Sequence, residues 1–456
     1  METVRKHARV VVVGSGPGGA TLARDLARAG WQVVVLERGE DVRRAPYYGT
    51  SLGPLRYADR GALLFSKEGI QIVRPLMLGG ATGMFCGSAA FPPPWLHERY
   101  GLDLATFAAE AAAELHVAPL PPELRGEAST RLAEAASTVG QDWRPQPKFM
   151  NPRRASRFDC GAKCMLGCRC RAKWNAAEWV DEAVVHGAEL LTGARVERIL
   201  REGRRVRGVR GRWRGRILEV EAPVVVLAAG GLGTPSVLRA SGLDQAGRGL
   251  ALDTTVIVYG RTRYRGLGHE PPMTWGYTDA ERGVMFSTLV DPWLLYPLIN
   301  GLGDPRRALS WPTWSRSVGV MIKLKDEVSG GLLPDGAVSK ALTPEERRRL
   351  DDAVAVARRI LVRAGADPES VFVSPPRGTH PSATVRLGEL VDRTLQTEID
   401  GLYVCDASVF PEALGQPTVL TIIALAKRLA THLLRREGER VVGQGTWAAP
   451  SAESPP

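Results

Sequence analysis

Three glycines near the start of the chain have the spacing of a phosphate-binding turn. Gly14, Gly16 and Gly19 form a G-x-G-x-x-G pattern in the segment GSGPGG. In this pattern the first glycine permits a tight turn, the second lets the backbone approach a pyrophosphate, and the third lets a helix pack closely on a strand. Glu37 follows at a spacing suited to accept hydrogen bonds from ribose hydroxyls. The pattern predicts a dinucleotide site.

A second group of candidate residues lies near the other end of the chain. His380 stands in Gly-Thr-His-Pro, and Asp406 ends a short apolar stretch, LYVCD. Pro417 begins a helix that is apolar over Val419–Ala426, and Gln416 stands just before it. The positive end of such a buried helix favours an anionic group. The residues alone leave open whether His380 has a functional role or is a structural histidine beside a proline.

Four of the six cysteines fall within eleven residues, as Cys160, Cys164, Cys168 and Cys170. Such clustering in a cytosolic chain favours metal, cluster or redox chemistry over a disulfide framework. The spacing matches neither the common ferredoxin run nor the paired C-x2-C of structural zinc sites. Inert or paired thiols therefore stay open beside an iron–sulfur cluster.

The elements that must position these residues begin with a β–α–β unit. Val10–Val13 is a continuous β-branched run, Ala20–Ala29 has helical spacing, and Trp31–Leu36 is a second buried strand. The segment 222–233 (APVVVLAAGGLG) predicts a late return to the same sheet, with Thr234 and Pro235 opening a helix. A single complete glycine fingerprint with this late strand favours FAD over a separate NAD(P)H domain.

The middle of the chain predicts a second, largely antiparallel domain. Strand-like runs at 256–259, 284–289 and 318–324 are separated by loops rich in Pro, Gly and Trp. A helix over Thr343–Gly365 starts with a capping box of Thr343 and Glu346. An aromatic lining of this domain would suit an apolar substrate, and ordinary aromatic packing is the alternative. The aromatic residues are Trp275, Tyr277, Phe286, Trp293, Tyr296, Trp311 and Trp314.

Length and composition exclude several classes of protein. The chain has 456 residues, 44% of them hydrophobic and 24% charged, which excludes a mostly disordered protein. No apolar run is long enough for a spanning helix, and the N-terminus lacks a secretory signal, so we expect a cytoplasmic location. The net charge of +11 includes an arginine cluster at 204–216. An exposed hairpin is favoured there over a nucleic-acid face, with an anionic substrate or lipid surface left open.

The motifs resemble those of the glucose–methanol–choline (GMC) oxidoreductase family. The resemblance runs from Val10 to about Leu434 through VVVGSGPGGA, LGGATG, VVVLAAGGLGTPSVLRASG, THP and GLYVCDASVFPEALGQPTVLTIIALAKRLA. It implies a Rossmann-like α/β FAD-binding domain joined to a mainly antiparallel-sheet substrate domain. The implied divisions are 1–253 (FAD-binding, with a cysteine-rich insert at 158–174), 254–378 (substrate-binding), 379–440 (return to the FAD-binding domain) and 441–456 (disordered tail).

The resemblance also implies an FAD-dependent dehydrogenase that oxidises a CH–OH group. His380 would take the hydroxyl proton while the carbon hydride moves to the flavin. Gln416 stands where most members have Asn or His, and glutamine cannot act as a base. The implied cofactor-binding residues are Gly14, Gly16, Gly19, Glu37, Gly79, Gly80, Thr82, Val196, Gly230, Asp406, Pro417 and Thr418.

Other expectations concern the cofactors, the electron acceptor and rival functions. Some GMC dehydrogenases bind an iron–sulfur cluster in a similar insert, matched here at Cys164, Cys168, Ala172 and Lys173. A cluster would pass electrons to a protein or quinone, whereas its absence would favour oxygen or a soluble acceptor. Residues 76–88 contain no histidine, so we expect noncovalent FAD. Lyase or decarboxylase chemistry on the same fold, and a flavin or iron–sulfur electron-transfer subunit, are the rivals.

Overall fold

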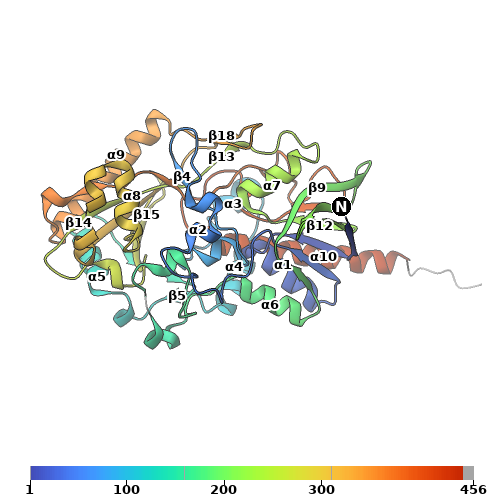
Figure 1. Cartoon of the computed structure of the whole chain (residues 1–456), viewed down its shortest axis with the longest axis horizontal. Helices are drawn as coiled ribbons and strands as arrows, with labels where there is room; N and C mark the ends of the chain where they lie inside the picture. Colours follow the sequence, from blue (N-terminus) through green and yellow to red (C-terminus); the bar gives the residue numbers. More distant parts are fainter. Residues whose placement is uncertain (1, 159, 310, 445–456) are drawn as a thin grey trace, which may run out of the picture.

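The computed structural model describes residues 2–158, 160–309 and 311–444. Two assemblies of secondary structure lie at opposite ends of an elongated molecule (Figure 1). The N-terminal glycine motif belongs to one end and most of residues 254–378 to the other, and each end has its own hydrophobic core.

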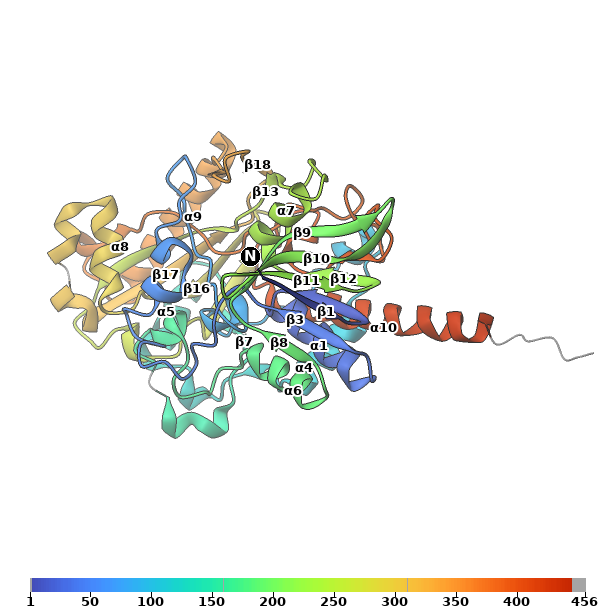
Figure 2. The same cartoon turned by 45° about the vertical axis from the view of Figure 1, so that its right-hand side comes forward.

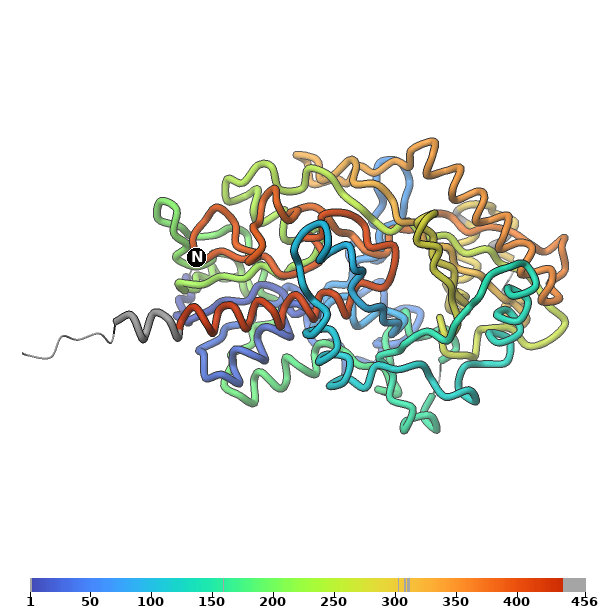
Figure 3. The backbone as a smooth tube through the Cα atoms, turned by 180° about the vertical axis from the view of Figure 1, so that it is seen from behind, coloured from blue at the N-terminus to red at the C-terminus, as the bar shows by residue number. Residues whose placement is uncertain are grey.

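The first end is built on a five-stranded parallel sheet. Its valine runs are buried on both faces, as strands covered by helices on each side require. The strand order is β22 (Leu402–Val404), β12 (Val224–Leu227), β2 (Val10–Val13), β3 (Val33–Leu36) and β8 (Glu189–Leu191). Helix α1 (Pro17–Arg28) packs between α6 (Ala177–Val185) and the long α10 (Val419–Gln444), which runs beside it (Figure 3).

A four-stranded sheet lies over this end and contains the arginine cluster (Figure 2). Val206 and Val209 are buried on its inner face, whereas the arginines face outward and several form ion pairs with glutamates. The cluster therefore forms the exposed hairpin that the sequence favoured. The strand order is β1 (Thr3–His7), β11 (Arg216–Glu221), β10 (Arg205–Trp213) and β9 (Ala194–Glu202).

The second end is a mostly antiparallel sheet, as predicted. Helix α9 (Pro344–Arg363) packs on three of its strands. It starts with the expected capping box, in which Thr343 and Glu346 exchange hydrogen bonds of 3.2 and 2.6 Å. The strand order is β4 (Gln71–Ile72), β21 (Arg377–Gly378), β14 (Thr254–Arg261), β17 (Ser317–Leu324), β16 (Val284–Thr288), β15 (Trp275–Asp279) and β6 (Arg144–Pro145), and β20 (Phe372–Val373) also pairs with β14.

The remaining elements connect or cover these sheets. The further helices are α2 (Pro54–Tyr57), α3 (Trp95–Tyr100), α4 (Ala105–Glu114), α5 (Glu127–Ser137), α7 (Gly230–Arg239) and α8 (Leu295–Gly303), with the 3-10 turn η2 (Gly80–Gly83). The further strands are β5 (Ala118–Pro119), β7 (Pro147–Lys148), β13 (Arg248–Leu250), β18 (Ser329–Leu332) and β19 (Val338–Ser339). Among the described residues, no helix combines the length and apolar character needed to cross a bilayer.

The pairing of β14 with β21 brings two distant segments together. Thr254 and Gly378 are partners in this pairing, so the residues next to them, Asp253 and Thr379, lie at the same edge. The backbone N–H groups of Thr379 and His380 both donate to the Leu252 carbonyl at 3.0 Å. This register places Asp253 beside His380, although 127 residues separate them.

Two predicted boundaries differ from the structure. Helix α7 begins at Gly230 instead of Thr234, because the Asp406 carboxylate accepts hydrogen bonds from the Gly230 N–H and the Thr234 hydroxyl. Helix α10 continues to Gln444, since no proline interrupts it, so the predicted tail at 441–456 starts too early; from residue 445 it lies outside the described residues.

Candidate active site

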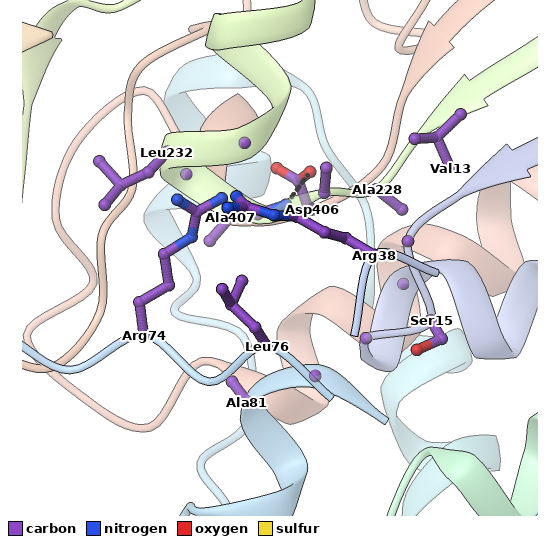
Figure 4. A pocket seen from close by; sticks show the side chains of 18 of the residues that line it. Val13, Ser15, Arg38, Arg74, Leu76, Ala81, Ala228, Leu232, Asp406 and Ala407 are labelled. Atoms are coloured by element: carbon purple, nitrogen blue, oxygen red, sulfur yellow. Dashed lines mark hydrogen bonds between the residues drawn. The ribbon is translucent and has the colours of Figure 1, made fainter. Parts of the chain in front are cut away.

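A cavity of about 570 Å³ lies at the carboxyl ends of β2, β3 and β12, the edge where open α/β sheets bind ligands. Its walls come from stretches of chain that are far apart in sequence (Figure 4). They are 13–18, 36–38, 73–76, 80–81, 194–197, 228–233, 236–237, 240, 379–381, 406–407, 418–419 and 422.

The turn between β2 and α1 is shaped for the close approach of a ligand. Gly14 has a φ of 105°, and a Cβ there would lie 2.3 Å from the Ala228 carbonyl oxygen. A Cβ at Gly16 would have no atom within 4 Å, and Gly16 lines the cavity, so the space beside it is open to a ligand. Gly19 does not line the cavity; a Cβ there would lie 2.0 Å from the Gly14 carbonyl oxygen, so this glycine permits close packing of α1. The N-terminus of α1 presents its N–H groups beside this space.

Glu37 lies at the end of β3, where the pattern predicts a ribose-binding acid. Its Oε2 accepts hydrogen bonds from the Ser15 N–H and hydroxyl at 2.9 and 2.6 Å, and its Oε1 accepts one from the Gly39 N–H at 2.7 Å. Burial raises the pKa of Glu37, and these hydrogen bonds oppose that shift. The carboxylate therefore fixes the glycine turn as well as lining the cavity.

Two arginines line the same cavity. The side chains of Arg38 and Arg74 reach toward each other across it (Figure 4). Arg74 donates to Asp59 Oδ2 at 2.9 Å, whereas Arg38 forms no ion pair with any residue that the structure describes. Burial lowers the pKa of Arg74, and the charge of Arg38 contributes in the same direction. Two guanidinium groups so close together favour an anion between them.

Asp406 holds two elements of the cavity wall together. Its Oδ2 accepts from the Gly230 N–H and the Thr234 hydroxyl at 2.8 and 2.5 Å, and its Oδ1 accepts from the Ser408 N–H at 2.8 Å. Burial raises the pKa of Asp406, against these hydrogen bonds. The carboxylate thus joins α7 to the segment that follows β22.

The other predicted cofactor residues divide into two groups. Gly80, Val196, Gly230 and Thr418 line the cavity, whereas Gly79, Thr82 and Pro417 do not. The Gly79 N–H donates to the Ser15 hydroxyl at 3.0 Å, and Thr82 donates to the Gly79 carbonyl at 2.6 Å. Gly79 and Thr82 therefore fix the position of their own glycine-rich loop relative to the N-terminal turn, without lining the cavity themselves.

His380 lines the cavity with one ring nitrogen already engaged. Its Nδ1 lies 2.8 Å from Asp253 Oδ2, and Asp253 is only 1% exposed. A carboxylate accepts hydrogen bonds, so Nδ1 carries the proton and Nε2 keeps the basic lone pair. Asp253 Oδ1 accepts the Gly415 N–H at 2.9 Å, which fixes the carboxylate in turn.

A buried lysine contributes to the electrostatics of this histidine. Lys323 donates to the hydroxyls of Thr379 and Thr255 at 2.6 and 3.1 Å. Burial and the charge of Lys323 lower the pKa of His380, whereas the hydrogen bond and charge of Asp253 raise it. The net shift is downward, so the ring is neutral, and able to accept a proton, at neutral pH.

Gln416, the predicted partner of His380, does not line the cavity. Its side-chain amide donates to the Phe91 carbonyl at 2.7 Å. In this arrangement Gln416 ties the start of α10 to the loop before α3.

The four clustered cysteines separate into two pairs. Cys160 and Cys164 are buried and hydrogen-bonded to each other. The sulfurs of Cys168 and Cys170 lie 3.4 Å apart and are half-buried. A hydrogen bond from Cys170 lowers the pKa of Cys168, against the effect of burial, and the backbone N–H groups of Ala172 and Lys173 and the charge of Lys173 act in the same direction as the hydrogen bond.

This pairing gives no support to the predicted iron–sulfur site. Within the described ranges, no three His, Cys, Asp or Glu side chains come together as a metal ion would require. The physical reason is the division into pairs, because a cluster needs its thiolates directed at one point.

The aromatic side chains of the second domain take part in packing. Phe286, Tyr296 and Trp314 are buried in its core, with Trp275 and Tyr277 packed against them. Tyr296 stacks edge-on against Tyr259. Trp293 is 43% exposed, and residue 311 is one whose side chain is not described. None of the described aromatic side chains in this set lines the cavity, which favours the packing alternative.

Sequence reasoning missed several residues of the site. The signals were weak: Lys323 is a single cation inside an apolar strand (VGVMIKL), and Arg38 directly follows the expected acid. Asp253 carried no motif of its own, and only the sheet register relates it to His380.

Comparisons with known proteins agree with this geometry. The family model for GMC oxidoreductase matches residues 97–255 and 333–426, together more than half of the chain, and an FAD-binding domain model matches residues 7–49. A GMC-type oxidoreductase of Mycobacterium tuberculosis is 29% identical, over 94% of this chain and 76% of the relative. The long-chain-alcohol oxidase FAO3 of Arabidopsis thaliana is 24% identical, over 95% of this chain and 69% of the relative.

Solved structures show the same fold. The crystal structure of pyridoxine 4-oxidase from Mesorbium loti has a TM-score of 0.69 at 19% identity, over 94% of this chain and 99% of that one. A formate oxidase has a TM-score of 0.71 at 14% identity, over 95% and 99% of the two chains.

Proposed function

Since this chain belongs to the GMC oxidoreductase family and is an FAD-dependent oxidoreductase acting on alcohol donors, we propose that it oxidises the CH–OH carbon of a small-molecule alcohol with His380 as general base. One observation carries the proposal. His380 lines the same cavity as the glycine turn, with Nδ1 held by Asp253 and Nε2 left basic.

The chain's own residues fit FAD. The open space at Gly16, the N-terminus of α1, and the paired guanidiniums of Arg38 and Arg74 suit a pyrophosphate, while Glu37 suits ribose hydroxyls. Gly230, Asp406 and Thr418 would hold the flavin end, with Val196 toward the adenosine end. When bound, FAD supplies the acceptor for the hydride that leaves the alcohol carbon.

His380 performs the proton transfer in this proposal. Its Nε2 takes the hydroxyl proton of the alcohol as the C–H bond breaks, and the resulting imidazolium is stabilised by the Asp253 carboxylate at 2.8 Å. Asp253 also fixes the tautomer, which makes it a positioning residue.

We propose noncovalent attachment of FAD for the reason given by the sequence, namely that residues 76–88 contain no histidine. Acid precipitation of the holoprotein tests this: the yellow colour should stay in the supernatant. Flavin in the washed precipitate would contradict noncovalent binding.

Anaerobic flavin reduction tests the proposed reaction. Excess alcohol from a panel of aliphatic, aryl and sterol alcohols should bleach the visible flavin absorption of the wild-type holoprotein. His380→Gln should retain flavin and lose roughly 10²- to 10⁴-fold in the rate of bleaching. His97→Gln, at an exposed position on α3, is the matched control and should bleach at the wild-type rate.

The outcomes separate the proposal from its rivals. Bleaching of His380→Gln at the wild-type rate would exclude His380 as the base. A flavin that no alcohol reduces, with conversion of a substrate at constant redox state, would indicate lyase or decarboxylase chemistry. Reoxidation by air, or only by a quinone or dye, would then identify the class of electron acceptor. The cytoplasmic location stays a prediction from the sequence, to be tested by cell fractionation.

A further inference from the structure

The cysteine-rich loop, which is the insert at 158–174, lies directly behind the cavity wall, and the proposed reaction does not use it. Lys173, at its end, is buried, and its ammonium donates to the carbonyls of Gly83, Phe85 and Cys164 at 3.2, 2.6 and 3.0 Å. Gly83 belongs to η2, whose first residue, Gly80, lines the cavity. The hydrogen bond from Lys173 to Gly83 therefore connects the loop to a turn that lines the cofactor site.

Cys168 and Cys170 stand apart from the other cysteines of this loop. Their sulfurs are in contact at 3.4 Å, and Cys168 Sγ also accepts the Lys173 N–H at 3.4 Å. Both side chains are half-buried, whereas Cys160 and Cys164 are buried. A reagent in solvent therefore reaches the second pair before the first.

The charge around this pair is positive. Arg169 and Arg171 flank Cys170 in the chain and are exposed, and Lys173, whose N–H contacts the Cys168 sulfur, adds a buried cation. Reactive cysteines occur in such electropositive, partly exposed surroundings, because the nucleophile is the thiolate.

We propose that Cys168 and Cys170 form a thiol pair that a hydroperoxide oxidises to a disulfide. The site and its chemistry go beyond the proposed alcohol oxidation and hold whether or not that reaction is correct.

The oxidation balances with hydrogen peroxide as the oxidant. The Cys168 sulfur attacks one peroxide oxygen, the O–O bond breaks, and the second oxygen leaves as water after taking a proton. The Cys170 sulfur then attacks the sulfenic acid on Cys168, the S–O bond breaks, and a second water leaves. In total two thiols lose two electrons and two protons, and one peroxide becomes two waters.

The geometry allows this bond with little movement. A disulfide has an S–S length of about 2.05 Å, so the sulfurs must approach by roughly 1.4 Å from their present 3.4 Å. Gly167, directly before Cys168, gives the backbone on that side freedom to follow.

Tryptic peptide mapping of the full-length holoprotein tests the proposal. Trypsin separates this region into the peptides 158–163, 164–169 and 170–171, so Cys168 and Cys170 fall in different peptides. After removal of reductant, treatment with stoichiometric hydrogen peroxide, and alkylation, we expect 164–169 joined to 170–171. In the untreated protein both peptides should be alkylated and separate.

Two serine variants form a matched pair within one peptide. Cys168→Ser should abolish the joined species, whereas Cys164→Ser should leave it unchanged. Cys86, at a distance from the loop in sequence, should still be alkylated after the same treatment.

Three results would overturn the proposal. The first is full alkylation of both Cys168 and Cys170 after peroxide. The second is a joined species of 158–163 with 164–169 in place of the expected one, which would show that Cys160, and not Cys170, takes part in the disulfide. The third is a brown iron–sulfur absorption in protein purified without oxygen, with all four cysteines protected until the iron is chelated.

Discussion

Replacing Asp253 with asparagine tests how His380 is held. The backbone at residue 253 has a φ of 48°, a region that asparagine tolerates at least as well as aspartate, so the fold should survive. The carboxylate serves two donors at once, the His380 Nδ1–H at 2.8 Å and the Gly415 N–H at 2.9 Å. An amide has only one oxygen, so Asp253→Asn can satisfy only one of them.

The magnitude follows from that conflict. If the amide oxygen keeps the Gly415 N–H, its NH₂ group faces His380 Nδ1 and forces the proton onto Nε2, which removes the basic lone pair. The opposite orientation leaves the buried Gly415 N–H facing an NH₂ group, at a cost of about 1–3 kcal/mol. The productive tautomer is then populated roughly 5- to 150-fold less, and the rate of flavin reduction should fall by the same factor.

Anaerobic stopped-flow measurement of flavin bleaching gives this rate directly, at a flavin content matched by absorbance. Because the charge of Asp253 raises the pKa of His380, its removal should also move the acidic limb of the pH profile downward. Raising the pH should not restore the rate, since the defect lies in the tautomer. Asp367→Asn, at an exposed ion pair with Arg261, is the control. A wild-type rate in flavin-loaded Asp253→Asn would refute the reasoning.

Three further predictions test other parts of the structure. Gly16→Val should give a folded apoprotein that retains little FAD, because its side chain enters open cavity space. Gly14→Val should instead lower the melting temperature, because its side chain would collide with the Ala228 carbonyl. Measurements of flavin content and thermal unfolding on both variants distinguish the two effects. Lys323→Met removes a cation that lowers the pKa of His380, so the acidic limb of the activity profile should move to higher pH while the alkaline plateau is kept; an unmoved limb would contradict this role. Thr343→Ala should lower the free energy of unfolding by about 1 kcal/mol without changing flavin content, because it removes only a helix cap.

The sequence predicts the elements of this fold better than the contacts between them. The valine runs before Gly14 and after Pro223 predict strands because residues buried on both faces must be apolar throughout. The capping box at Thr343 is a local interaction over three residues, and it forms as expected. Such features depend on near neighbours in the chain.

The sequence does not predict the contacts between segments that are distant in the chain. The meeting of Asp253 with His380 depends on the register of β14 and β21, and a shift of one residue would turn the side chains to the opposite faces. Gln416 has the motif position of a substrate contact, yet its amide is used by the Phe91 carbonyl. The division of the cysteines into pairs depends in the same way on how the loop folds around Lys173.

The charges buried around His380 act on its pKa in opposite directions, since Lys323 lowers it and Asp253 raises it. Asp253 lies beside the ring, and its backbone N–H donates to Asp326 at 3.1 Å, while Lys340 lies 3.7 Å from the same carboxylate. With Lys323 on the other side, two buried anions face two buried cations. The ring is therefore neutral before proton transfer, and the charge that it gains on accepting the proton is directly hydrogen-bonded to Asp253.

Removing any one of these two carboxylates and two lysines leaves an opposite charge uncompensated in the interior, so single substitutions here should affect stability as well as rate. For this reason a rate change at Asp253 or Lys323 identifies a catalytic effect only when it is measured on folded, flavin-loaded protein.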